Sequence, residues 1–267
     1  MAAPFIVRGF PMNDYEYFKR EIYKLTSIDL NCYKERQMKR RIDTMIRNKK
    51  FETYEKYILA MKQNPSVFDD FLSYMTINVS EFYRNPEQWV FLEKEVLPYL
   101  FQKFGKNLKI WSAACSTGDE PYSLVMTLAK YMPLAQIQIL ATDIDRRALE
   151  KAKIGLYVDK SIEHVPTDLK KKYFTQVGSN YKIKDEIKNR VTFQRHDLLK
   201  DPYPRDCHLV ICRNVLIYFT EDTKDALFRR FYDCLILGGT FFIGSTEQIM
   251  DYKEIGYQRM NSFFYVR

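Results

Sequence analysis

The sequence predicts an α/β protein made of an all-helical N-terminal domain, a parallel sheet and a small inserted β-subdomain. Over residues 12–88, apolar residues recur at helical spacing and no strand pattern competes. Over 89–267, apolar runs of strand character alternate with helical patterns, which is typical of a parallel sheet with helices on both faces. Residues 155–190 interrupt that alternation with a hairpin pattern, so we expect them to form the insertion.

Composition excludes several classes of protein. The chain has 267 residues, of which 46% are hydrophobic and 28% charged, as in globular proteins. The sequence has no run of eighteen apolar residues, so we expect no membrane insertion. Residues 1–11 lack the apolar core and cleavage site of a signal peptide and are left out of the fold prediction.

The cysteines and the net charge indicate the cellular compartment and the kind of partner. The cysteines are scattered without a CxxC pair, so we predict neither a metal site nor a disulfide framework, and we expect a cytoplasmic protein: Cys32, Cys115, Cys207, Cys212 and Cys234. The net charge of +8 favours an acidic partner, which leaves nucleic acid, anionic lipid and acidic protein surfaces open.

The helical and strand segments follow from periodicity. We expect helices near 14–25, 34–48, 51–62 and 65–76, the last with Asn64 as its cap and Pro65 in its first turn. Strands are predicted in "LKIWSAA", "IQILATDI", "VTFQRHDL", "CHLVICRN", "GGTFFIGST" and "SFFYVR".

The loop "WSAACSTGDEPYS" (111–123) lies between the first predicted strand and a helix. It has the single glycine Gly118, and Asp119 and Glu120 stand where a phosphate-binding loop would have open N–H groups. A cation or a hydroxyl-bearing ligand suits these carboxylates. They also complement the helix dipole, and the loop alone does not decide between the two interpretations.

Acids at the ends of later strands favour a ligand. Asp143 ends the second strand, where Rossmann-like folds bind ribose hydroxyls, and Asp145 is available to cap the next helix. Asp197 follows the third strand and can accept from an adenine amino group, with Leu198 against the ring. An adenosine without phosphates fits this set. We therefore predict S-adenosylmethionine as cofactor, and a methyltransferase strand order with "SFFYVR" as a late antiparallel strand.

These motifs resemble the chemotaxis receptor methyltransferases of the CheR family over residues 12–267. The resemblance lies in "MTINVSEFYRNPEQW", "SAACSTGDEPYS", "ATDIDRRALEKAKIGLY", "HDLL", "CRNVLIYF" and "FFIGSTE", in that order. It implies a Rossmann-like S-adenosylmethionine methyltransferase that esterifies glutamates on the cytoplasmic helical region of chemoreceptors, releasing S-adenosylhomocysteine. We expect the enzyme to act as a monomer.

The resemblance also implies a set of site residues. Cofactor contacts are expected at Asn78, Ser80, Arg84, Glu120, Asp143, Asp197, Leu198, Arg213 and Asn214. Arg84, Arg213 and Tyr218 are expected near the transferred methyl as catalytic residues. Ser80 replaces the usual Thr and Asp119 the commoner Glu; both changes are conservative.

The expected chemistry needs no general base, because a glutamate with a pKa of about 4.3 is already ionised at neutral pH. None of the three histidines lies in a catalytic motif, in agreement with this expectation. Arg84 and Arg213 can pair with a carboxylate of the cofactor or the substrate, or serve structural ion pairs.

Substrate docking is predicted on the helix at 34–48. An apolar stripe of Met38, Ile42, Met45 and Ile46 faces one way. Arg36, Arg40 and Arg47 lie together on the other side, within about 40° at 100° per residue. This row suits an acidic helix; a merely solvated face is the alternative.

Two other function classes remain. A nucleic-acid methyltransferase is suggested by the basic charge, although "DPYP" at 201–204 has the wrong order and place for an amino-methylating motif. A non-catalytic cofactor sensor is disfavoured by the intact Arg213 and Tyr218. We expect no nucleic acid as partner.

Overall fold

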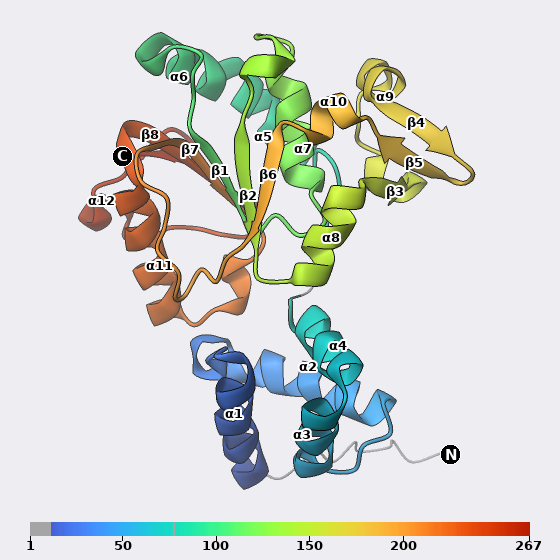
Figure 1. Ribbon diagram of the computed structural model, residues 1–267. Helices are drawn as coiled ribbons and strands as arrows, with labels where there is room; N and C mark the ends of the chain where they lie inside the picture. Colours follow the sequence, from blue (N-terminus) through green and yellow to red (C-terminus); the bar gives the residue numbers. More distant parts are fainter. Residues whose placement is uncertain (1–11, 77) are drawn as a thin grey trace, which may run out of the picture. The chain divides into compact units, whose positions relative to one another are not determined.

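The computed structural model describes residues 12–76 and 78–267, and the expectation about residues 1–11 lies outside this part (Figure 1). The chain divides into two compact units, each described below by itself. One comprises Met1–Ile77 with Tyr218–Thr223, and the other comprises Asn78–Ile217 with Lys224–Arg267. Within the described ranges, no helix combines the length and the apolar character that a membrane crossing requires.

The helical unit contains the helices that periodicity predicted. They are α1 (Met12–Thr26), α2 (Glu35–Asn48), α3 (Tyr54–Gln63) and α4 (Pro65–Met75), with a 3₁₀ turn at Leu30–Cys32. The Asn64 side chain accepts from the N–H of Ser66, and Pro65 opens α4, as expected. The rings of Phe18, Tyr54 and Phe71 pack together in the core of this unit.

Helix α2 has the two-sided character that its sequence predicted. Met38, Ile42, Met45 and Ile46 are buried in the helical unit. On the other side, Arg36 and Arg40 are exposed and Arg47 is half-buried. The apolar stripe therefore holds the helix in place while most of the arginine row faces solvent.

A distant segment of the chain completes the helical unit. Tyr33 and Phe219 form an antiparallel bridge, and their ring centroids lie 4.8 Å apart. The N–H of Lys34 donates to the carbonyl of Tyr218, and that of Thr220 to the carbonyl of Cys32, both at 2.9 Å. These bonds attach Tyr218–Thr223 to the chain just before α2.

The larger unit is built on a seven-stranded sheet in the order β6-β2-β1-β7-β8-β10-β9. Its strands are β1 (Ile110–Ala113), β2 (Ile139–Asp143), β6 (Val191–Arg195), β7 (Cys207–Cys212), β8 (Leu235–Ile243), β9 (Gln258–Arg259) and β10 (Phe264–Val266). Strands β6, β2, β1, β7 and β8 are parallel, and β10 is antiparallel to β8. This confirms the predicted order and the late antiparallel strand.

Helices cover both faces of this sheet, with α11 and α12 on one side and α7 on the other (Figure 1). The helices of this unit are α5 (Pro86–Phe91), a π-helical turn (Leu92–Val96), α6 (Leu97–Phe104), α7 (Asp119–Leu128), α8 (Arg146–Ile154) and α12 (Tyr252–Ile255), with a 3₁₀ turn at Leu134–Gln136. Helix α11 (Glu221–Cys234) belongs to it from Lys224 onward, and a 3₁₀ turn (Leu216–Tyr218) belongs to it up to Ile217. Trp111 and Phe241 of the sheet pack against Phe231 of α11, at centroid distances of 5.6 and 4.7 Å. Ile110 packs in the core of the opposite face with Val125 of α7.

The region predicted as an insertion forms a separate three-stranded sheet in the order β3-β5-β4. Its elements are β3 (Leu156–Val158), a 3₁₀ turn (Asp159–Ile162), α9 (Thr167–Tyr173), β4 (Phe174–Val177), β5 (Asn180–Ile183) and α10 (Asp185–Lys188). Strands β4 and β5 make the expected hairpin, with Gly178 in its turn at a φ of +60°.

Residues 78–88 belong to the larger unit, whereas the sequence had suggested grouping them with the helices. The reason is local bonding: Asn78 contacts the side chains of Asp145 and Ser116, and the N–H of Tyr83 donates to the Ser123 hydroxyl at 3.0 Å. These side-chain bonds are not visible in a helical or strand pattern.

Candidate functional site

The candidate site lies where the parallel strands end. The loop after β1 carries left-handed backbone at Ala114 (φ +59°), Ser116 (φ +48°) and Gly118 (φ +87°). A side chain at Gly118 would also meet the Cβ of Ala152 at 2.9 Å, so the loop requires glycine there. Backbone strain of this kind is concentrated at ligand-binding loops in proteins, and here it falls on the loop that the sequence had singled out.

Asp143 at the end of β2 binds this loop directly. Its carboxylate accepts from the backbone N–H of Ser116 at 2.8 Å and from that of Asp145 at 2.9 Å. Burial raises the pKa of the Asp143 carboxyl to about 6, despite these two hydrogen bonds. Asp143 is therefore a buried acceptor that holds its proton to a higher pH than an exposed aspartate does.

Asp145 caps α8, as the sequence predicted. One oxygen of its carboxylate accepts from the N–H groups of Arg147 and Ala148 at 2.8 and 3.2 Å. The other accepts from the Asn78 side-chain amide at 2.6 Å, and the amide oxygen of Asn78 accepts from the Ser116 hydroxyl at 3.1 Å. Asn78 thus joins the loops that follow β1 and β2.

Asp119 and Glu120 open α7; the Asp119 carboxylate is buried and that of Glu120 is mostly buried. The hydroxyls of Thr117 and Ser80 hydrogen-bond to Asp119, yet burial raises the pKa of Asp119 to about 6. Glu120 accepts from the Ser112 hydroxyl at 2.8 Å, and burial raises its pKa although Arg213 lies nearby. Two acids at a helix start would repel a phosphate, which agrees with an uncharged or cationic ligand.

Arg213 forms the other wall of the site. Its Nη1 lies 3.6 Å from Glu120, and its Nη2 donates to the Arg84 carbonyl at 2.7 Å and to the Gln88 side chain at 2.8 Å. The guanidinium also lies 4.6 Å from the ring centroid of Phe242. Arg213 therefore fixes residues 84–88 beside Glu120, which favours a positioning role over direct attack chemistry.

Two of the remaining predicted cofactor residues lie at a neighbouring strand end, and Arg84 lies just before α5. Asp197 and Leu198 are buried just after β6, and Asp197 accepts from the N–H of Leu199 at 2.9 Å. The N–H of His196 donates to the carbonyl of Asp143 at 3.0 Å, which holds the ends of β2 and β6 together. Arg84 is half-buried, and its guanidinium donates to the carbonyl of Val79 at 3.2 Å.

Glu247 is a site residue that the sequence analysis did not assign. It lies after β8 and accepts from the N–H groups of Asn214 and Leu216, at 3.0 and 2.7 Å. Its place in the quoted segment "FFIGSTE", four residues after the end of β8, was the available signal, and it is a weak one.

Tyr218, Arg36, Arg40 and Arg47 belong to the helical unit. Tyr218 is half-buried, and its carbonyl is bound by Lys34. The catalytic role of Tyr218 and the docking role of the arginines stay predictions.

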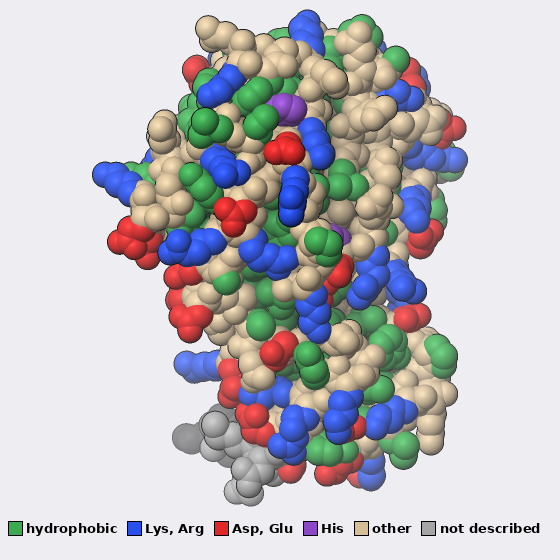
Figure 2. Space-filling view, turned by 60° about the vertical axis from the view of Figure 1, so that its left-hand side comes forward, with side chains coloured by type: hydrophobic (Ala, Val, Ile, Leu, Met, Phe, Trp, Pro, Cys, Tyr) green, Lys and Arg blue, Asp and Glu red, His purple; other side chains and the backbone are tan. Residues whose placement is uncertain are grey.

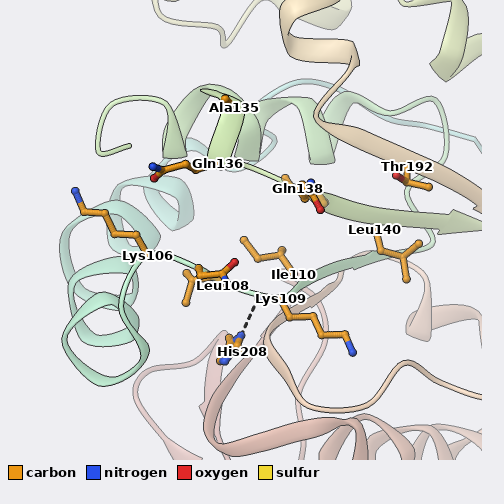
Figure 3. Close-up of a pocket in the computed structure, with 12 residues that line it drawn as sticks. Lys106, Leu108, Lys109, Ile110, Ala135, Gln136, Gln138, Leu140, Thr192 and His208 are labelled. Atoms are coloured by element: carbon orange, nitrogen blue, oxygen red, sulfur yellow. Dashed lines mark hydrogen bonds between the residues drawn. The ribbon is translucent and has the colours of Figure 1, made fainter. Parts of the chain in front are cut away.

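A cavity of about 890 Å³ lies at the opposite ends of these strands (Figure 3). It is lined by Lys106, Lys109, Gln136 and Gln138 and by residues at the beginnings of β1, β2 and β6. The His208 ring accepts from the N–H of Lys109 at 2.7 Å on its wall. Because ligands of open α/β sheets bind at the carboxyl ends of the strands, this cavity is separate from the candidate site.

The residues present fit S-adenosylmethionine. Asp143 and Asp197 are buried acids at neighbouring strand ends, as hydroxyl and amino donors of an adenosine would require, and no phosphate site is needed beside Asp119 and Glu120. Among the described atoms, Arg213 Nε and Gln88 Nε2 are buried donors without a hydrogen-bond partner in the protein. Such donors suit the carboxylate of an amino acid tail.

Comparison with known proteins agrees with this geometry. Residues 78–263 match the family model "CheR methyltransferase, SAM binding domain", and residues 13–76 match "CheR methyltransferase, all-alpha domain". Chemotaxis protein methyltransferases of Listeria innocua and Listeria monocytogenes are each 41% identical over 254 residues, covering 95% of this chain and 97% of theirs. That of Borreliella burgdorferi is 30% identical over 249 residues, covering 88% of each chain.

These matches confirm the predicted family, the Rossmann-like fold, the cofactor class and the reaction. The chain belongs to the CheR methyltransferase family, S-adenosylmethionine-dependent enzymes that methylate glutamate side chains of chemoreceptors in chemotactic adaptation.

Proposed function

We propose that this enzyme acts as a cytoplasmic monomer on the acidic helical region of chemoreceptors, with the larger unit holding the cofactor and α2 docking the receptor. The observation that carries the proposal is the gathering of Asp143, Glu120, Asp197 and Arg213 at the ends of the parallel strands. The relatives named above are chemotaxis methyltransferases, which supports a receptor as the acceptor.

The division of roles within the site follows from what each side chain touches. Asp143, held by Ser116 and Asp145, accepts from the ribose, and Asp197 accepts from the adenine amino group beside Leu198. Asn78 and Ser80 bind the cofactor from the segment before α5, because they already bond to the loops after β1 and β2.

S-adenosylmethionine supplies a methyl group on a sulfonium, which an ionised glutamate displaces without a general base. The protein must therefore align the carboxylate and keep water out rather than move a proton. Arg213 keeps the segment that carries Arg84 in place, and Arg84 attracts the carboxylate of the acceptor. Tyr218 is kept as a further proposed catalytic residue, as the resemblance to the family implies.

Receptor docking is assigned to the arginine row of α2. Arg36 and Arg40 are exposed, and the helix is anchored through its opposite face. Guanidinium groups bind carboxylates in a bidentate fork, so a row of them suits a helix that carries glutamates. A solvated surface would need no such concentration of arginine.

Transfer of label from tritiated cofactor tests the proposed acceptor. Methyl esters hydrolyse in mild alkali and release methanol, whereas methylated amines and rings do not. Label on receptor fragments should become volatile after brief alkaline treatment, and changing the acceptor glutamates to alanine or glutamine should abolish transfer. Stable label on the protein, or label on added RNA, would contradict the acceptor assignment while leaving the fold and cofactor in place.

Nucleic acid is the second acceptor to test, because the net charge is +8. On the face shown in Figure 2, however, basic side chains are interspersed with acidic ones and form no continuous stripe. A nucleic-acid groove usually has a clustered basic surface. RNA therefore serves as the competing substrate in the same assay.

A further inference from the structure

Glu247 is a buried carboxylate that binds only backbone among its described hydrogen bonds. Its side chain is 4% exposed. One oxygen accepts from the N–H groups of Gly244 and Asn214, at 2.6 and 3.0 Å, and the other from the N–H of Leu216 at 2.7 Å. The carboxylate therefore joins the loop after β8 to the turn after β7.

The turn that Glu247 binds has little regular structure of its own. Asn214 has a left-handed backbone with a φ of +60°, and the residues on either side of it leave β7 for a short 3₁₀ turn. Alternate N–H groups, those of Asn214 and Leu216, point to one anionic side chain. Such a concave set of N–H groups is a typical anion-binding nest, here filled by a residue of the same chain.

Gly244 makes this contact possible. A Cβ at this position would lie 2.7 Å from the backbone nitrogen of Asn214 and 2.7 Å from the carboxylate of Glu247. Both distances are shorter than real Cβ contacts, so any side chain would push the two loops apart. The space between the two loops is therefore too narrow for any residue other than glycine at position 244.

We propose that Glu247, with Gly244, is a positioning residue for cofactor binding. It holds the turn so that Arg213 and Asn214, which directly follow β7, face the cofactor. Glu247 itself touches backbone and not the reacting groups. The inference rests on the cofactor roles proposed above for Arg213 and Asn214, and it does not depend on which macromolecule accepts the methyl.

The test is cofactor binding by Glu247→Gln and Glu247→Asp. Glutamine keeps the shape, but it removes the charge and replaces one acceptor oxygen with an amide that opposes the N–H donors. Loss of hydrogen bonds to a charged acceptor is expected to weaken S-adenosylhomocysteine binding about tenfold or more. Aspartate keeps the charge and should recover part of the affinity. The exposed Glu254, in α12, gives the matched control Glu254→Gln, which should bind as the wild type does.

Kinetics separate positioning from general destabilisation. The KM for S-adenosylmethionine should rise in Glu247→Gln, whereas kcat at saturating cofactor should change little, because the lost interaction affects binding of substrate and transition state alike. Equal affinity of Glu247→Gln and wild type for S-adenosylhomocysteine would overturn the proposal.

Gly244→Ala provides an independent route if Glu247→Gln does not fold. It crowds the same contact without removing the carboxylate, so it should also weaken cofactor binding, and unchanged affinity in this variant would likewise contradict the proposal. The binding measurements above use S-adenosylhomocysteine and no receptor. If the wild-type enzyme fails to esterify receptor, that result therefore overturns only the proposed acceptor and not the role of Glu247.

Discussion

The carboxylate of Asp143 accepts a hydrogen bond from the backbone N–H of Ser116 at 2.8 Å, and thereby connects the end of β2 to the left-handed part of the loop after β1. A single acid thus shapes the loop and, in the proposed function, also accepts from the ligand. The loop "CSTGDE" has one glycine where dinucleotide loops have three, and here a side chain bonds to the loop backbone.

Asp143→Ala should weaken S-adenosylmethionine binding. The ribose would lose a charged acceptor and the N–H of Ser116 would lose its partner. A hydrogen bond to a charged group contributes about 1.5–3 kcal/mol, so the dissociation constant should rise roughly ten- to a hundredfold. Titration calorimetry measures this directly. Unchanged affinity would remove Asp143 from the site.

Cofactor affinity should depend on pH through the same residue. Burial raises the pKa of Asp143 from its ordinary 3.8 to about 6, so the carboxyl is charged above pH 6 and becomes protonated below it. The protonated acid is a weaker acceptor for ribose hydroxyls. Affinity should therefore be steady above about pH 7 and fall as pH drops through 6.

Asp143→Asn separates this titration from that of Asp119, whose pKa is also about 6. If Asp143 is responsible, the variant should bind weakly with a flatter pH profile than the wild type. If cofactor affinity of Asp143→Asn still falls fully as pH drops through 6, the titrating group is Asp119 or another residue.

Replacing Arg36, Arg40 and Arg47 together by Glu should greatly reduce receptor methylation. The reason is charge reversal on the proposed docking face, two of whose members are exposed. Cofactor affinity should stay at the wild-type value, because these arginines belong to the helical unit. A normal rate of receptor methylation would show that the face is only solvated surface.

Receptor methylation by the wild-type enzyme should also weaken as salt rises. Exposed charge pairs are screened beyond about 10 Å at 0.1 M salt. The KM for receptor should increase with sodium chloride concentration, and the triple variant should lose most of this dependence. A salt-independent wild-type KM would argue against docking by charge.

Arg213→Gln should destabilise the fold as well as the site. It would leave Glu120 buried without its cation and would break the bonds to the Arg84 carbonyl and Gln88. Removing one member of a buried charge pair costs about 3–5 kcal/mol, which urea unfolding would detect. A free energy of unfolding equal to that of the wild type would show that the contacts of Arg213 do not stabilise the fold.

The sequence predicted the elements whose signals are local. The sheet followed from apolar runs bounded by turns, and Asp145 was available as a cap because it directly precedes α8. Asp143 was found in the same way, as a polar residue at a strand end. These features need only a few neighbouring residues to be recognised.

Other features depend on contacts between distant parts of the chain. Arg213 bonds to the carbonyl of Arg84 through its side chain, so the placement of residues 78–88 could not be read from periodicity. Glu247 binds the turn after β7 from beyond β8 and resembles any polar loop residue in the sequence. A hydrogen bond from a side chain to distant backbone has no sequence signature, which hides such positioning residues.

The attachment of Tyr218–Thr223 to the helical unit has a consequence for engineering. The chain enters that unit twice, so a clean exchange of receptor specificity between relatives requires two grafts. Exchanging residues 12–76 alone would pair a foreign Tyr33 position with the resident Phe219. Chimaeras that carry both segments should express in soluble form more readily than those cut only near residue 77.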